Sequence, residues 1–355
     1  MSTVIPQNPP RVRFGPLEGV RVLDLSRLLP GPYASLVLSD LGADVVKVED
    51  PEPGDYLREI SAGMFAALNR GKRSIVLDLK TPAGAAELRR LCTVADVLIE
   101  SFRPGVLERL GFADLLADPG RLVICRISGY GQSGPWRDRA GHDIGYVALA
   151  GIVARNGGVP AVQLADLFGG GQNAVIGVLA ALVERARTGR GRVLDVAMAQ
   201  GSTGLLLPHL GELPDAPENM LDGSRPCYRV YACKDGGRYA LGALELKFWQ
   251  RFCAAVGRRA WADRGFDLAL VPEVDALFAT RTREEWDVFL CSADCCGEPV
   301  LEPAELRDHP VFGDLFLGDL PRTYPPLVAT ADLPSGRPPA RGEHTEEVLR
   351  EWSAR

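Results

Sequence analysis

The sequence lacks several features that would direct it toward common protein classes. Its 40 lysines and arginines are fewer than its 46 acidic residues, so the formal charge of −6 provides no general attraction to nucleic acid or anionic lipid. No apolar run approaches the roughly 20 residues that a membrane-spanning helix requires. The eight cysteines show no paired CxxC spacing, which argues against zinc and favours reduced, mostly buried thiols. We therefore expect no nucleic acid, membrane or metal partner.

Length and composition indicate an ordinary globular protein. With 355 residues, 46% hydrophobic and 24% charged, the chain is long enough for two domains. Residues 1–13 are polar and contain prolines, without the apolar core of a secretory signal. We expect a cytoplasmic enzyme, in which local basic residues would have to bind any polyanionic ligand.

The first half of the chain alternates apolar runs with helical segments. Runs that are apolar throughout are typical of parallel strands covered on both faces. We predict strands at 20–26, 44–49, 74–79, 96–101, 122–128 and 193–196, and helices at 32–41, 81–95, 105–110 and 170–187. This order predicts an α/β fold with a Rossmann-like layer.

A change of pattern near Pro208 indicates a second, smaller α+β domain. Short strands are predicted at 228–232 and 238–242, and helices at 246–256 and 283–291. We assign 1–200 and 315–355 to the large domain, 201–214 to a linker and 215–314 to the small domain. The tail is proline-rich at 321–339, and a helix starting at Thr345 is expected to pack back on the large domain.

One glycine motif matches a dinucleotide-binding pattern only in letters. Gly129, Gly131 and Gly134 have the GxGxxG spacing and follow a predicted strand. The dinucleotide fingerprint also needs a helix that begins there, and no helical period follows Pro135. We predict turn glycines and do not expect NAD.

Two groups of basic residues lie near the ends of predicted strands. Arg70, Lys72 and Arg73 precede one strand, and Arg103 and Arg109 follow another. Arginine and lysine bind phosphate well. A solvated surface run and a phosphate site both remain open.

A histidine and an aspartate are the candidate acid–base groups. His142 follows Gly141, and Asp166 is predicted to end a strand-like run, 161–165, before a glycine-rich helix start at 169–171. Exposed amides at such a start would favour negative charge. Taken singly, a structural histidine and a capping aspartate remain the simpler interpretations, as does a helix-start acid for Glu245.

Ordered matches along nearly the whole chain resemble CoA-transferase family III (CaiB/BaiF type), which includes the α-methylacyl-CoA racemases. The matching segments are 15–26, 31–32, 41–49, 72–74, 100–105, 129–131, 188–191 and 342–345. The resemblance implies an interlocked homodimer whose large Rossmann-like domain holds CoA.

The resemblance also implies particular contacts to CoA. By position these fall on Leu28, Leu29, Leu68, Lys72, Phe102 and Arg109. From the two groups of basic residues, Arg73 and Arg103 are added as candidate contacts to CoA. Ser101 stands where transferases often have Asn, and Asp50 where some members have Arg.

His142 stands where transferases usually carry Tyr, and this difference resembles the racemase branch. That branch implies proton transfer at the α-carbon of a 2-methylacyl-CoA, with His142 and Asp166 as acid and base and Glu245 orienting His142. Amides after Asp166 would then hold the enolate oxygen. CoA enters as part of the substrate, and no other cofactor is expected.

Two other functions remain open. In a CoA-transferase, Asp166 would attack the thioester and form an aspartyl intermediate. A non-catalytic acyl-CoA binding protein would use the same scaffold without chemistry. The connection between His142 and Asp166 is shorter than in typical racemases, which could reshape the acyl pocket.

Overall fold

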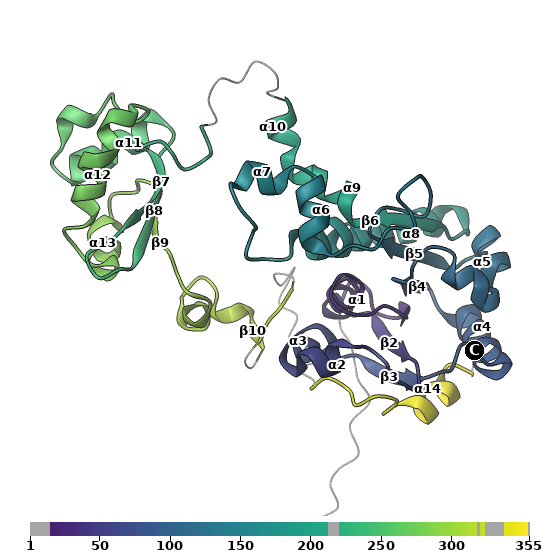
Figure 1. The fold of residues 1–355 in the computed structure, drawn as a ribbon. Helices are drawn as coiled ribbons and strands as arrows, with labels where there is room; N and C mark the ends of the chain where they lie inside the picture. Colours follow the sequence, from purple (N-terminus) through teal and green to yellow (C-terminus); the bar gives the residue numbers. More distant parts are fainter. Residues whose placement is uncertain (1–14, 212–219, 318–319, 324–336, 354–355) are drawn as a thin grey trace, which may run out of the picture. The chain divides into compact units, whose positions relative to one another are not determined.

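The computed structural model describes residues 15–211, 220–317, 320–323 and 337–353. The chain divides into two compact units. The larger unit runs to Leu210 and resumes at Leu315, and the smaller one is Gly211–Asp314. Figure 1 shows the elements of each unit.

A six-stranded sheet forms the centre of the larger unit (Figure 1). Its strands are β1 Arg21–Asp24, β2 Asp44–Glu49, β3 Arg73–Val76, β4 Val97–Glu100, β5 Val123–Ser128 and β6 Val193–Ala197. Their order is β3-β2-β1-β4-β5-β6, and every neighbouring pair is parallel. The prediction of a Rossmann-like α/β layer is confirmed, with small differences at the strand ends.

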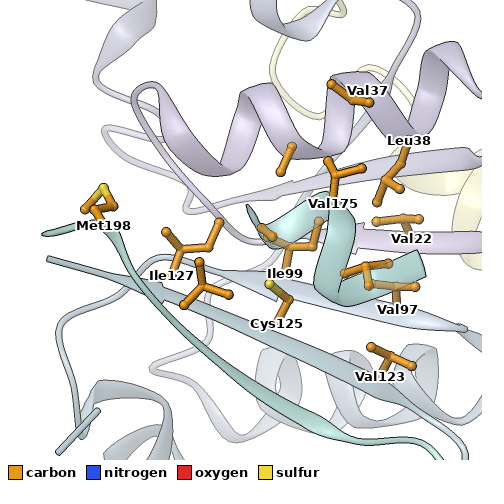
Figure 2. Packing of buried hydrophobic residues seen from close by; sticks show 14 of the residues in the cluster. Val22, Val37, Leu38, Val97, Ile99, Val123, Cys125, Ile127, Val175 and Met198 are labelled. Carbon is orange, nitrogen blue, oxygen red and sulfur yellow. The ribbon is translucent and has the colours of Figure 1, made fainter. Parts of the chain in front are cut away.

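The sheet is buried on both faces because successive side chains enter opposite cores. Val22 belongs to the cluster covered by α1 Pro30–Asp40 and α8 Asn173–Thr188. Leu23, the next residue, belongs to the cluster covered by α4 Pro82–Val94 and α14 Thr345–Glu351. Figure 2 shows the first cluster, in which Val37, Leu38 and Val175 pack over the strands. Burial on both faces explains why the strands are apolar throughout.

Contrary to the expectation that no apolar run approaches this length, one helical stretch, Ala165–Thr188, is long and apolar enough to cross a membrane by length and composition alone. Its residues Ala174, Val175 and Val178 are buried in the first core cluster. This packing is that of a core helix.

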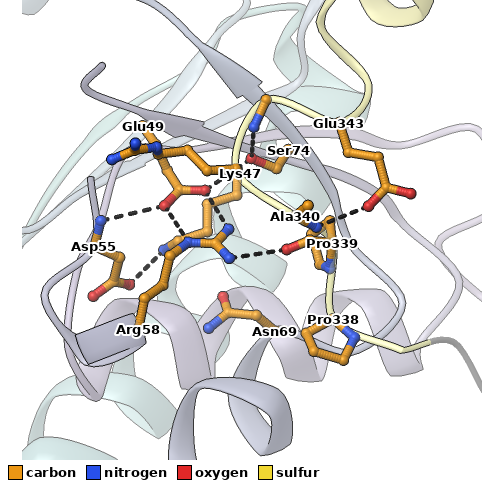
Figure 3. Close-up of polar contacts among 12 residues, drawn as sticks. Lys47, Glu49, Asp55, Arg58, Asn69, Ser74, Pro338, Pro339, Ala340 and Glu343 are labelled. Carbon is orange, nitrogen blue, oxygen red and sulfur yellow. Dashed lines mark hydrogen bonds and ion pairs between the residues drawn. The ribbon is translucent and has the colours of Figure 1, made fainter. Parts of the chain in front are cut away.

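The C-terminal segment packs back on the larger unit, as expected, and there it covers the edge strand β3 (Figure 3). The N–H of His344 donates to the carbonyl of Ser74 at 2.9 Å, and the N–H of Gly342 donates to its hydroxyl at 3.0 Å. Arg58 donates to the carbonyl of Pro339 at 3.0 Å and to both oxygens of Glu49. The segment therefore pairs backbone groups that an edge strand would otherwise expose. Much of the proline-rich tail, 324–336, lies outside the described residues.

The smaller unit is an α+β layer with its own core. Its antiparallel sheet has the order β7 Tyr228–Ala232, β8 Arg238–Gly242 and β9 Gly297–Pro299. Helices α11 Leu246–Ala255, α12 Val271–Phe278 and α13 Arg283–Leu290 supply aromatic side chains to this core. Tyr231 stacks on Phe278 with ring centroids 4.4 Å apart.

Several short helices were not predicted. They are α2 Leu57–Ile60, α3 Ala62–Asn69, α6 Asp143–Leu149, α7 Ile152–Asn156, α9 Met198–Ser202, α10 Leu207–Gly211 and α12. The range 201–214, expected as a linker, is helical through Gly211, and 212–214 lie outside the described residues. The predicted helix at 105–110 is followed by a kink at Gly111, where φ is +92°, and then by a second helical segment, α5 Ala113–Ala117.

The GxGxxG sequence forms turns, as predicted. Gly131 and Gly134 have φ of +95° and +88°, a left-handed conformation that favours glycine. The N–H of Gly131 donates to the Ser128 hydroxyl at 3.0 Å, and the next helix, α6, begins only at Asp143. No helix start is therefore available there to bind a pyrophosphate.

The thiols agree with the sequence interpretation, because six of the eight free cysteines are buried and only Cys291 and Cys296 are exposed. Among the described residues, no group of three or more His, Cys, Asp or Glu is placed to hold a metal ion.

Candidate active site

A cavity of about 650 Å³ lies at the carboxyl ends of β1, β4 and β5. The order of the sheet reverses between β1 and β4, the place where open α/β sheets form a binding crevice. Leu28 lines the cavity after β1, Phe102 after β4 and Gly129 after β5. The strand order of the sheet therefore determines where this cavity forms.

Basic side chains dominate the charge of this cavity, which we call the arginine-lined cavity. Its arginines are Arg27, Arg103, Arg137 and Arg139. Among the described residues that line it, Asp166 is the one carboxylate. The guanidinium of Arg139 lies over the ring of Trp136 at 3.9 Å. Because guanidinium groups bind phosphate through paired N–H donors, this lining suits a phosphorylated ligand.

A second cavity of about 350 Å³ has a different lining and is called the apolar cavity. Its apolar residues are Leu29, Met64, Ile144, Val159 and Pro160. Gln163 and Asp143 also contribute. His142 and Asp166 line both cavities. The two candidate acid–base groups therefore lie where a basic cavity meets an apolar one.

His142 is held at the start of α6. It is the N-cap residue, with an extended backbone at φ −135° and ψ 171°. Its carbonyl accepts the N–H groups of Gly145 at 2.9 Å and Tyr146 at 3.2 Å. Its backbone is therefore fixed by the helix, while its exposed side chain lines both cavities.

Asp166 lies in the first turn of a helix. Helical residues η2 Ala165–Gln172 run directly into α8, so the predicted strand at 161–165 is wrong. The N–H of Asp166 donates to Oδ1 of Asp143 at 2.8 Å. Burial raises the pKa of the Asp166 carboxyl to about 7, and the negative charge of Asp143 adds to this shift. Asp166 can therefore exist in both protonation states near neutral pH.

The glycines after Asp166 serve close packing, so their predicted role as an exposed helix start is wrong. A Cβ on Gly169 would lie 2.4 Å from the carbonyl oxygen of Met198 in α9. A Cβ on Gly171 would lie 2.6 Å from the ring of Tyr33 in α1. Side chains here would force the neighbouring helices away from Asp166.

The structure brings together some of the predicted CoA contacts. Leu28, Phe102 and Arg103 line the arginine-lined cavity, and Leu29 lines the apolar cavity. Leu68, Lys72, Arg73 and Arg109 line neither of these two cavities. The contacts of this second group with CoA stay predictions.

The basic residues 70–73 are not a solvated surface run. Lys72 is buried, and its ammonium group donates to the carbonyl of Pro32 and the amide oxygen of Asn69, both at 2.9 Å. The same group lies 3.2 Å from Oδ2 of Asp24. Arg70 and Arg73 are also buried and paired with carboxylates of the larger unit. These cations stabilise the fold because each has an internal acceptor.

Glu245 belongs to the smaller unit, where it is exposed and precedes α11 as its N-cap residue. The interpretation as a helix-start acid is confirmed. Its role toward His142 stays a prediction.

Several site residues were missed in the sequence. Arg137 and Arg139 lie in the loop after β5, close in sequence to His142. Tyr146 is buried in the arginine-lined cavity wall, and burial together with Tyr130 raises its pKa to about 12. Asp143 had one available signal, its position directly after His142 at a helix start.

Comparisons with known proteins agree with this geometry. The α-methylacyl-CoA racemase of Homo sapiens is 39% identical over 95% of this chain and 93% of its own length. The succinyl-CoA–D-citramalate CoA-transferase of Chloroflexus aurantiacus is 32% identical over 97% of this chain and 94% of its own.

Solved structures show the same fold. A CaiB/BaiF family protein from Brucella suis superposes with a TM-score of 0.81 at 30% identity, over 95% of this chain and 99% of that chain. The sequence profile of CoA-transferase family III matches residues 17–316. The resemblance seen in the sequence is thus confirmed, and the chain belongs to CoA-transferase family III.

Proposed function

We propose that this protein is an α-methylacyl-CoA racemase, which moves the α-proton of a 2-methylacyl-CoA between the two faces of the α-carbon. The observation that carries the proposal is the place of His142 and Asp166, which line both cavities. A thioester joins the phosphorylated part of the substrate to its acyl chain and belongs at this junction. The name of the human relative supports the same reaction.

The two groups would act on opposite faces of the α-carbon. One takes the α-proton, and the electron pair of the C–H bond moves toward the thioester oxygen to form an enolate. The other group then gives its proton to the opposite face, and the roles reverse for the other enantiomer. A carboxyl with its pKa raised to about 7 can serve in either direction at neutral pH.

Backbone amides at the start of α6, and not those after Asp166, would be free to donate to the enolate oxygen. The amides after Asp166 lie inside a continuous helix, Ala165–Thr188. Within the described part of the chain, the N–H groups of Asp143 and Ile144 have no acceptor, as is usual for a first helical turn. A single well-aimed donor contributes about 10²–10³ in rate.

The arginine-lined cavity would hold the nucleotide part of CoA. Arg103, Arg137 and Arg139 offer guanidinium groups to its phosphates. Leu28 and Phe102 offer apolar surface to its base and pantetheine arm. The apolar cavity would take the acyl chain.

A CoA-transferase is the second candidate, favoured by relatives with that name that match most of the chain. In that reaction the Asp166 carboxylate would attack the thioester carbonyl, and CoA would leave as a thiolate. A pKa near 7 leaves part of the carboxyl protonated at neutral pH, which lowers the fraction of nucleophile.

One experiment separates these functions. Purified protein is incubated with a single enantiomer of 2-methyldecanoyl-CoA in D₂O, with and without succinate as an acceptor acid. We expect one deuterium at the α-carbon and loss of optical purity, independent of succinate. CoA transfer that requires succinate, with no deuterium uptake, would establish the transferase instead. Tight binding with neither reaction would establish a non-catalytic acyl-CoA binding protein.

We propose in addition an interlocked homodimer that acts in the cytoplasm with CoA as part of its substrate and no other cofactor. The family resemblance supports the dimer, and exposed apolar side chains such as Leu207 and Leu210 in α10 are compatible with it. Light scattering on the purified protein measures the oligomeric state, and a monomer would overturn this part.

A further inference from the structure

One hydrogen bond connects the backbone turns that carry the two acid–base groups, His142 and Asp166. Asp143 directly follows His142 at the start of α6, and its Oδ1 accepts the N–H of Asp166 at 2.8 Å. The two aspartates are 23 positions apart in the sequence, on separate helices. A single side chain therefore links the turn that carries His142 to the turn that carries Asp166.

The same contact places two carboxyl groups near each other. Asp143 and Asp166 both line the apolar cavity, and both are only partly exposed. A carboxylate disfavours a second negative charge nearby, so the contact acts on the charge of Asp166 as well as on its position.

We propose that Asp143 is a positioning residue that locks Asp166 to the turn of His142 and, by its own charge, favours the protonated carboxyl of Asp166. The effect of this arrangement on catalysis rests on the proposed function, in which one group removes the α-proton and the other delivers a proton to the opposite face. Asp143 itself touches the backbone of Asp166 and need not contact the reacting carbon.

Among the groups around Asp166, Asp143 is the charged one that acts on the ionisation of the Asp166 carboxyl. On α6, His142 and Tyr146 line the same cavity wall, and on α1, Tyr33 packs near Gly171. Arg103 lines the arginine-lined cavity and acts on Tyr146. Burial raises the pKa of Asp166 to about 7, and Asp143 is the charged group that raises it further.

This arrangement matters for a reaction that runs in both directions. The α-proton of a thioester is weakly acidic, so an ordinary carboxylate is a poor base for it. A carboxyl that titrates near neutrality takes the proton more readily and still gives it back. Without Asp143, Asp166 would be a weaker base in a less fixed position.

Two substitutions separate position from charge. Asp143→Asn keeps an oxygen that can accept the N–H of Asp166 but removes the negative charge. Asp143→Ala removes both. Asp118→Asn is the matched control, because Asp118 is an exposed carboxylate paired with Arg190 at the surface.

The first readout is a ¹³C NMR titration of the full-length protein labelled at the aspartate carboxyl carbons, with Asp166→Asn to assign the signal. We expect the Asp166 signal to titrate near pH 7 in the wild type and in Asp118→Asn, and at lower pH in Asp143→Asn. An unchanged midpoint in Asp143→Asn would overturn the proposal.

The second readout is the pH profile of deuterium uptake at the α-carbon. In Asp143→Asn we expect its acidic limb at lower pH with KM little changed, whereas Asp143→Ala also loses about 10- to 100-fold in kcat. Equal profiles in Asp143→Asn and the wild type would contradict the role. If the wild type takes up no deuterium but the NMR midpoint still moves, the proposed function fails and the contact's effect on Asp166 stands.

Discussion

The ammonium group of Lys72 lies 3.2 Å from Oδ2 of Asp24, and both side chains are fully buried beneath the first turn of α1. Oδ1 of the same carboxylate accepts the N–H of Ser26 at 2.9 Å and the hydroxyl of Ser26, and Oδ2 accepts the hydroxyl of Ser35. Asp24 ends β1, and the segment that follows it lines the arginine-lined cavity. This buried pair therefore supports the wall of the candidate site from inside.

The pair predicts a specific loss of stability at low pH. Burial alone would raise the pKa of Asp24, but the charges of Lys72 and Lys47 and the serine hydroxyls lower it from 3.8 to about 2. The depressed pKa contributes about 2 kcal/mol of stability above pH 4, which is lost as the pH falls through 2. Asp24→Asn should lower the free energy of unfolding by about 3 kcal/mol at pH 7, with a smaller difference near pH 2.

Urea unfolding at a series of pH values measures this effect. Asp114→Asn is the control, because its ion pair with Arg89 is exposed and should add nothing measurable. A gap between wild type and Asp24→Asn that is constant from pH 7 to pH 2 would show that Asp24 is not the titrating group.

The two proposed acid–base groups predict a difference between enantiomers. His142→Gln and Asp166→Asn should each lower racemisation by about 10²–10⁴, since each removes the acid or base from one face. Each variant should still exchange deuterium with the one enantiomer whose α-proton faces the remaining base. Mass spectrometry on separated enantiomers measures this, with His309→Gln, a histidine beside Phe312 in the smaller unit, as the control. Equal exchange of both enantiomers by both variants would rule out two opposed groups.

Much of the fold was predictable because its strands are buried on both faces. The run 44–49 matches β2, and 228–232 and 238–242 match β7 and β8. The short helices α2, α3 and α7 were missed because a few turns do not display a helical period. β9 Gly297–Pro299 was missed because a glycine and a proline occupy two of its three positions.

The site was only partly predictable, since its two cavities form by folding. His142 and Asp166 were identified by residue type together with the family resemblance. The buried pairing of Lys72 was not predictable, because its partner Asp24 lies 48 positions away in the sequence. Arg137 and Arg139 were missed because the strand order of the folded sheet brings the loop after β5 next to the ends of β1 and β4, and the sequence does not give that order.

Substitution in the glycine run after Asp166 is predicted to disturb helix packing and not to remove an anion-binding site. Gly169→Ala should lower the free energy of unfolding by about 1–3 kcal/mol, because its Cβ would lie 2.4 Å from a backbone oxygen of Met198. Gly63→Ala in α3 is the matched control: nothing lies within 4 Å of its Cβ, and alanine favours a helix. Thermal unfolding measures both, and a Gly169→Ala protein as stable as Gly63→Ala would show that the helices do not approach closely here.

The apolar cavity predicts how the acyl chain is selected. Val159 lines this cavity of about 350 Å³, so the larger ring in Val159→Phe should occupy space that the acyl chain needs. The ratio of kcat/KM for 2-methyldecanoyl-CoA over 2-methylbutanoyl-CoA should then fall about tenfold. Val162→Phe is the control, because Val162 lies in the same connection and is as exposed as Val159 (58% against 57%) but does not line the cavity. If Val159→Phe lowers kcat/KM equally for both substrates, the acyl chain binds elsewhere. If Val162→Phe changes the ratio as much as Val159→Phe does, the effect comes from a disturbed connection and not from the cavity.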